Sequence, residues 1–151
     1  MADDHPFGAL AGTWTGEGAG SYPTIEPFGY REELTIEAVP GRPVAHWRSR
    51  TRDAATGEPR HAESGFLRSV GDGRVEFVVA HSFGIVEVGT GGFTGDRLEV
   101  DSGGLVGTPS AKRVDEVQRR YRFDGDSLTY DVAMAAVGEP VTHHLQATLH
   151  R

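Results

Sequence analysis

Apolar and polar residues alternate along most of this chain, in short segments separated by residues that favour turns. A step of two residues returns to the same face of a β-strand, so strict alternation predicts strands with one buried face. In one such segment Leu34 and Ile36 share a face with Glu32. The segments that show this pattern are 31–39, 74–80, 85–89, 97–101 and 127–134. Pairs such as Pro40-Gly41 and Gly95-Asp96 predict tight turns between them.

Strands at regular spacing with tight connections predict an all-β fold, a single antiparallel up-and-down barrel over residues 1–151. The barrel is favoured over a sandwich because long crossover segments are missing. Residues 4–11 are expected to form a short helical turn that caps one barrel end. The segment Gly12-x-Trp14-x-Gly16-x-Gly18 opens the first strand, as a comparable Gly-x-Trp strand does in lipocalins and fatty-acid-binding proteins. Trp14 is predicted to face inward and to fill the interior at the base of the barrel.

Composition excludes several classes of function. A formal net charge of −7 argues against a nucleic-acid partner, and the arginines at 48–52 and 119–122 are interpreted as polar faces of strands. The chain has no cysteine, which excludes disulfides and thiolate catalysis. No apolar run approaches the ~18 residues that span a bilayer, and the N-terminus lacks an apolar signal region. We therefore expect a cytoplasmic protein without a membrane partner.

Two adjacent histidines, His143 and His144, lie in the predicted last strand. Neutral imidazole is a common ligand of iron and other transition metals. Alternation alone groups His143 with Leu145 and Leu149 on the apolar face, and it puts His144 on the polar face with Gln146. On this rule His143 would point inward.

Four motifs in order resemble the nitrobindin family of haem-binding β-barrels. The first is the glycine–tryptophan strand, Gly12 to Gly18, and the second is Tyr22-Pro-Thr-Ile25 followed by Phe28-x-Tyr-x-Glu-Glu33. The third is Arg60-His-Ala-Glu-Ser-Gly-Phe-Leu-Arg68, similar to the family's His-x-Glu-x-Gly-aromatic-x-Arg segment. The fourth is Met134-(x)5-Pro140-x-Thr-x-His-Leu145. Two stretches, 80–84 and 134–138, depart from the family pattern and would alter the pocket lining.

The resemblance implies a barrel of about ten strands that holds one haem b per chain. Its ferric form would convert peroxynitrite to nitrate, and its ferrous form would bind nitric oxide. The resemblance selects His144, the histidine before the leucine, as the iron ligand. It places His61 in the distal wall as a second catalytic residue, and Thr24 and Lys112 against the haem propionates. A homodimer is also expected.

Other interpretations of the same residues stay open. A non-enzymatic carrier of an apolar ligand such as a fatty acid would share the barrel and the Gly-x-Trp strand, but it does not need the C-terminal histidine. His61 could instead be a core histidine bonded to Glu63, and Lys112 an ordinary exposed lysine. A third interpretation is a histidine-only metal site formed by His61, His81 and His143.

Overall fold

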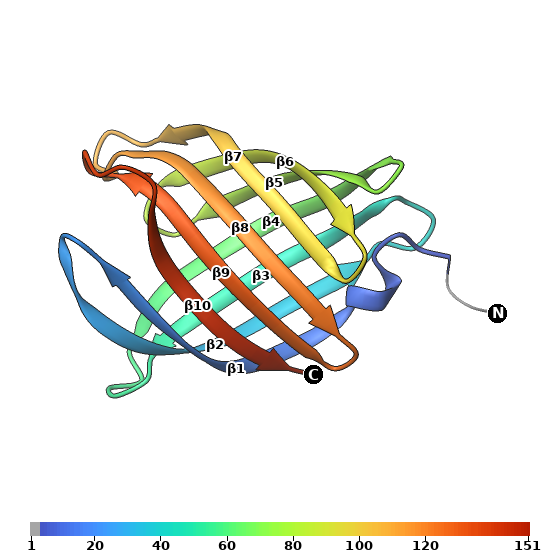
Figure 1. Ribbon diagram of the computed structural model, residues 1–151, viewed down its shortest axis with the longest axis horizontal. Helices are drawn as coiled ribbons and strands as arrows, with labels where there is room; N and C mark the ends of the chain where they lie inside the picture. Colours follow the sequence, from blue (N-terminus) through green and yellow to red (C-terminus); the bar gives the residue numbers. More distant parts are fainter. Residues whose placement is uncertain (1–3) are drawn as a thin grey trace.

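The computed structural model describes residues 4–151 and contains ten antiparallel strands closed into a barrel (Figure 1). Each strand pairs with its neighbour in the chain, and β1 pairs with β10 to close the wall. This confirms the predicted up-and-down barrel. The strands are β1 Gly12–Tyr22, β2 Ile25–Ala38, β3 Val44–Asp53, β4 Pro59–Gly71, β5 Arg74–His81, β6 Ile85–Thr94, β7 Arg97–Gly107, β8 Val114–Asp124, β9 Ser127–Ala136 and β10 Thr142–His150.

The predicted inward faces are the buried ones. Leu34 and Ile36 on β2 are each 1% exposed, and Glu32 is buried beside them on the same face. The alternation of β5, β7 and β9 is equally regular, with Val75, Phe77, Val79, Leu98, Val100, Leu128, Tyr130 and Val132 all in the core. Because each of these residues lies two positions from the next, the pleat alone aims them into the barrel.

One end of the barrel is closed by the segment before β1. A 3-10 turn, η1 (Gly8–Leu10), carries buried Leu10 and follows buried Phe7, which confirms the predicted short cap. Trp14 is fully buried, as predicted, and its indole N–H donates to the Leu10 carbonyl at 2.9 Å. No helix in the part of the chain that the structure describes is long and apolar enough to cross a membrane.

The opposite end of the barrel gathers every second connection. Because the strands run up and down in chain order, the links after β1, β3, β5, β7 and β9 all lie at this end, away from η1 (Figure 1). We call it the open end. Thr24 lies in the first of these links and Lys112 in the fourth, while His61 and His144 lie near the start of β4 and β10. Residues distant in sequence therefore meet at one rim.

Two glycines of the first strand let neighbouring atoms approach its inner face. A Cβ on Gly16 would lie 2.1 Å from the Thr148 carbonyl oxygen of β10, and one on Gly18 would lie 2.3 Å from the Tyr30 ring. The motif Gly12-x-Trp14-x-Gly16-x-Gly18 is thus a packing requirement of barrel closure, in addition to placing Trp14.

We predict that Gly16→Ala destabilises the fold by about 1–3 kcal/mol, because the added methyl collides with backbone that cannot move without disturbing the β1–β10 ladder. Urea unfolding followed by tryptophan fluorescence measures the effect. Gly29→Ala is the matched control, since a Cβ there meets its nearest atom at an ordinary 3.4 Å. Equal stability of the two variants would contradict this account of β1.

Candidate functional site

A buried ion cluster crosses the barrel interior above the apolar floor. Arg119 of β8 donates from Nη2 to Glu63 Oε2 at 2.9 Å and to Glu87 Oε1 at 2.8 Å, and from Nε to Glu87 Oε2 at 3.1 Å. Its Nη1 donates to Glu63 Oε1 and to the Tyr121 hydroxyl. The Arg119 side chain is only 6% exposed. This corrects the sequence interpretation, which put Arg119 on a polar outer face.

Charge pairing keeps this cluster ionised despite its burial. Burial alone would raise the pKa of Glu87, but Arg119 and the hydrogen bonds from His81 and Arg119 outweigh it and lower that pKa to about 2. Burial likewise opposes the ionisation of Glu63, yet Arg119 holds the pKa of this carboxyl well below its usual range. Burial would lower the pKa of Arg119, whereas the two carboxylates raise it well above its ordinary value. Two negative charges thus surround one guanidinium.

A third carboxyl group, Glu32, lies outside that pairing. Its Oε2 accepts from the Ser49 hydroxyl at 2.5 Å, and its Oε1 accepts from the Tyr130 hydroxyl, which lies 2.6 Å from the Tyr30 hydroxyl. Burial raises the pKa of Glu32 to about 7, and these hydrogen bonds only partly offset the effect. Glu32 thus differs from Glu63 and Glu87, whose pKa values are lowered by Arg119.

Two histidines lie between the ion cluster and the open end. His81 Nε2 is 2.9 Å from Glu87 Oε1, and His81 Nδ1 is 3.0 Å from His61 Nε2. Because ionised Glu87 can only accept, Nε2 of His81 carries the proton and its Nδ1 holds a lone pair. His61 Nε2 then donates to that lone pair. His61 Nδ1 is left as the one buried side-chain nitrogen or oxygen without a partner among residues 4–151.

The last strand carries a bulge at the predicted iron ligand. His143 pairs with Ala133 of β9 and Leu145 with Val132, so His144 is an extra residue with no opposite number. Such a bulge re-aims side chains. His144 is half-buried, its ring meets the buried Tyr22 ring edge-on at 5.5 Å, and its Nδ1 donates to the Ser21 carbonyl at 3.0 Å. Simple alternation is wrong here, because it assumed a regular strand.

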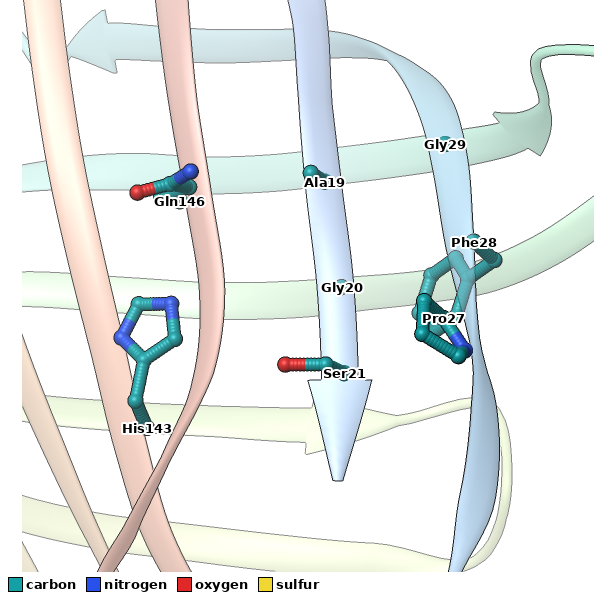
Figure 2. Close-up of a pocket in the computed structure, with 8 residues that line it drawn as sticks. All are labelled: Ala19, Gly20, Ser21, Pro27, Phe28, Gly29, His143 and Gln146. Carbon is teal, nitrogen blue, oxygen red and sulfur yellow. The ribbon is translucent and has the colours of Figure 1, made fainter. Parts of the chain in front are cut away.

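The bulge leaves His143 on the outer face. Its side chain is 46% exposed and lies 3.9 Å from the Asp131 carboxylate. With Gln146 it lines a depression of about 540 Å³ that extends from β10 across β1 to β2 (Figure 2). The other lining residues are Ala19, Gly20, Ser21, Pro27, Phe28 and Gly29. Most of the residues that line this depression are exposed, whereas His61, His81 and the buried ion cluster lie inside the barrel.

The structure brings some of the predicted site residues together and leaves others apart. His61 and His144 both belong to the open end, and burial lowers the pKa of His144 although the hydrogen bond to Ser21 opposes that shift. Thr24 and Lys112 are exposed in the rim connections and contact neither histidine by a hydrogen bond. Sequence reasoning missed Arg119 and Glu87. Each lies two positions along its strand from apolar residues that point inward, and therefore on the same face as they do.

Comparison with known proteins agrees with this architecture. Residues 4–151 match the family model described as "THAP4-like, heme-binding beta-barrel domain". The chain is 50% identical to a peroxynitrite isomerase 1 of Mycolicibacterium paratuberculosis, over 99% of this chain and 97% of the relative. It is 49% identical to a peroxynitrite isomerase 2 of Mycobacterium avium, with the same coverage. The crystal structure of Rv2717c from M. tuberculosis superposes with a TM-score of 0.89 at 43% identity, covering 96% of this chain and 94% of that one.

The raised pKa of Glu32 predicts a pH-dependent stability. The folded chain holds this proton up to a pH of about 7, whereas an unfolded glutamate loses it near 4.5, so the contribution is fully present below 4.5 and lost as the pH rises through 7. Glu32→Gln stays neutral. We expect its stability relative to the parent to rise by about 3 kcal/mol from pH 4.5 to 8, at roughly 1.4 kcal/mol per pKa unit.

Urea unfolding at several pH values measures this difference. Glu33→Gln is the matched control, because the Glu33 side chain is 44% exposed and pairs with Arg50 at the surface. A stability difference for Glu32→Gln that stays flat with pH would show that Glu32 is ionised in the folded chain.

Proposed function

Because the chain belongs to the family of THAP4-like, heme-binding beta-barrel domains, the nitrobindins, we propose that it is a ferric haem b protein that isomerises peroxynitrite to nitrate. The observation that carries the proposal is the state of His144. Its Nδ1–H is held by the Ser21 carbonyl, which leaves the lone pair on Nε2 for a metal.

The surroundings of His144 suit an axial haem ligand. A ligating histidine commonly donates its other ring N–H to a backbone carbonyl, which fixes the tautomer and the ring orientation. The pKa of His144 is lowered by burial, which favours the neutral, ligating form. The edge contact with Tyr22 fixes the ring further, because the Tyr22 hydroxyl donates to the Met134 carbonyl and accepts from the Ala136 N–H of β9.

We assign His61 to the opposite wall of the same pocket. Its Nδ1 is buried and unpartnered, so this atom is available to a small molecule bound on that side. The His61 ring is held by its hydrogen bond with His81. It also packs against the Phe83 ring, and the two ring centroids are 4.9 Å apart. His61 would therefore contact a small molecule bound on that side without itself binding the haem iron, and it would hydrogen-bond an oxyanion through Nδ1 once that nitrogen carries a proton.

The rim residues complete the proposed pocket. Thr24 and Lys112 lie in connections at the open end, where the carboxylate tails of a haem held by His144 would emerge. A hydroxyl and an ammonium group suit such carboxylates, the ammonium by charge. Both side chains are exposed, so each is free to reorient toward a ligand.

Isomerisation requires no net proton or electron from the protein. Ferric haem, when bound, would supply an electrophilic iron for this rearrangement, while His144 would hold the iron and His61 would contact the bound substrate. We also propose that nitric oxide binds the same open position.

The outer surface of the barrel carries an apolar patch. Phe66, Val78 and Val88 face outward as neighbours across β4, β5 and β6, and they support the expected homodimer. The cytoplasmic location stays a prediction from the sequence.

The axial ligand is tested by one pair of adjacent variants. His144→Ala is expected to lose the ferric Soret band or most of the retained haem, because the remaining contacts offer no bond to iron. His143→Ala is the matched control and should keep both, since its ring lies outside the wall. Absorbance spectra after haem addition and desalting measure the outcome. Haem loss in His143→Ala with retention in His144→Ala would overturn the assignment.

The reaction itself is tested by stopped-flow decay of peroxynitrite. The rate should rise in proportion to ferric protein and yield nitrate as the main product, and cyanide should suppress it by occupying the open position. His61→Ala should change the rate without expelling haem. Haem-free protein is the control. If it scavenges as well as the ferric form does, oxidation of side chains such as Met134 explains the decay, and a carrier of an apolar ligand becomes the better interpretation.

A further inference from the structure

We propose that His61, Glu63 and His81 form a binding site for a divalent transition-metal ion, with zinc as its representative, separate from the haem ligand His144. The proposal goes beyond the haem function and does not depend on it. His61 and Glu63 lie two residues apart on the inner face of β4, and His81 pairs directly with Glu63 from β5. Strand geometry alone thus brings three metal-ligating side chains to one point.

The donor atoms have the spacing that a metal ion requires. His61 Nε2 and His81 Nδ1 are 3.0 Å apart, and each lies 3.6 Å from Glu63 Oε2. Ligands bound at about 2.1 Å in a tetrahedral zinc site are separated by about 3.4 Å. A triangle with edges of 3.0, 3.6 and 3.6 Å therefore holds a metal ion with little movement and leaves a fourth position open. Two imidazoles and one carboxylate are also a common catalytic zinc set.

The groups around these ligands orient them as in metal sites. Glu87 accepts from His81 Nε2 at 2.9 Å and thereby turns the Nδ1 lone pair toward the centre, which is the carboxylate–histidine–metal arrangement. Trp47 Nε1 donates to Glu63 Oε1 at 2.9 Å, and Arg119 fixes both oxygens of the same carboxylate. The donors are thus held in place before any metal arrives.

Charge also favours a cation at this point. Two carboxylates, Glu63 and Glu87, pair with the single guanidinium of Arg119 at 2.9 and 2.8 Å, so this cluster has more acidic than basic side chains. Metal binding displaces the proton that bridges His61 and His81. The partnerless His61 Nδ1 accepts that proton, so the imidazole binds through Nε2 as a neutral ligand. Phe83 covers both rings, at centroid distances of 4.9 and 5.2 Å.

The test is isothermal titration of zinc chloride into the full-length chain after treatment with a chelator, with and without haem. We expect one zinc per chain in both forms. His81→Ala and His61→Ala should each weaken binding by at least about tenfold, and Glu87→Gln by about tenfold or more through the orientation of His81. Cobalt, added in place of zinc, should give visible d–d bands that His81→Ala abolishes.

Two control variants separate this site from others. His143→Ala removes an exposed histidine that also has a carboxylate neighbour, and His144→Ala removes the proposed haem ligand. Both should bind zinc as the parent does, and circular dichroism should confirm that every variant is folded. His61→Ala keeps the test decisive if His81→Ala fails to fold, because the His61 side chain is 25% exposed at the barrel mouth. No stoichiometric zinc binding, equal binding by folded His61→Ala, or loss of binding in His144→Ala or on haem loading would overturn the proposal.

Discussion

The ion cluster of Arg119 with Glu63 and Glu87 is the interaction on which the interior of this barrel depends. A guanidinium in this position is tolerated only while its carboxylates remain, and removal of one partner from such a buried group costs about 3–5 kcal/mol. The cluster joins β8 to β4 and β6 across the lumen. The cluster also positions neighbouring side chains, since Glu87 orients the His81 ring and Glu63 accepts a hydrogen bond from Trp47. Below it the core is apolar and closed by η1, so chemistry is confined to the open end.

A single extra residue in β10 gives that open end its proposed ligand. Without the bulge, His143 would face inward beside Leu145 and His144 would face solvent. With it, His144 lies against Tyr22 and donates to the Ser21 carbonyl, just beyond the last paired residues of β1 and β10, Gly20 and Leu145. The imidazole N–H thus satisfies the Ser21 carbonyl at the point where the backbone pairing of β1 and β10 ends. Because the proton of the ring is on Nδ1, the Nε2 lone pair is left for a metal.

Local pattern was sufficient for most of the fold and insufficient for most of the site. Leu34, Phe77 and Leu128 could be placed inward because a regular strand needs only a period of two, and Trp14 could be placed at the base because a large aromatic suits a closed end. Arg119 was misjudged because an arginine side chain usually faces solvent. Its inward position depends on carboxylates from strands that are distant in sequence. The bulge at His144 was invisible to alternation. Only the resemblance to nitrobindins selected His144, the half-buried histidine, as the proposed ligand.

The central claim is that the β10 bulge presents His144, and not its neighbour, to a haem iron. The most direct measurement is a crystal structure of the haem-loaded protein at a resolution that shows the axial ligand. The expected result is a bond between iron and Nε2 of His144, with Nδ1 still donating to the Ser21 carbonyl and His143 outside the wall. Iron bound by His143 in a regular, unbulged strand, or haem held without a histidine from β10, would contradict it.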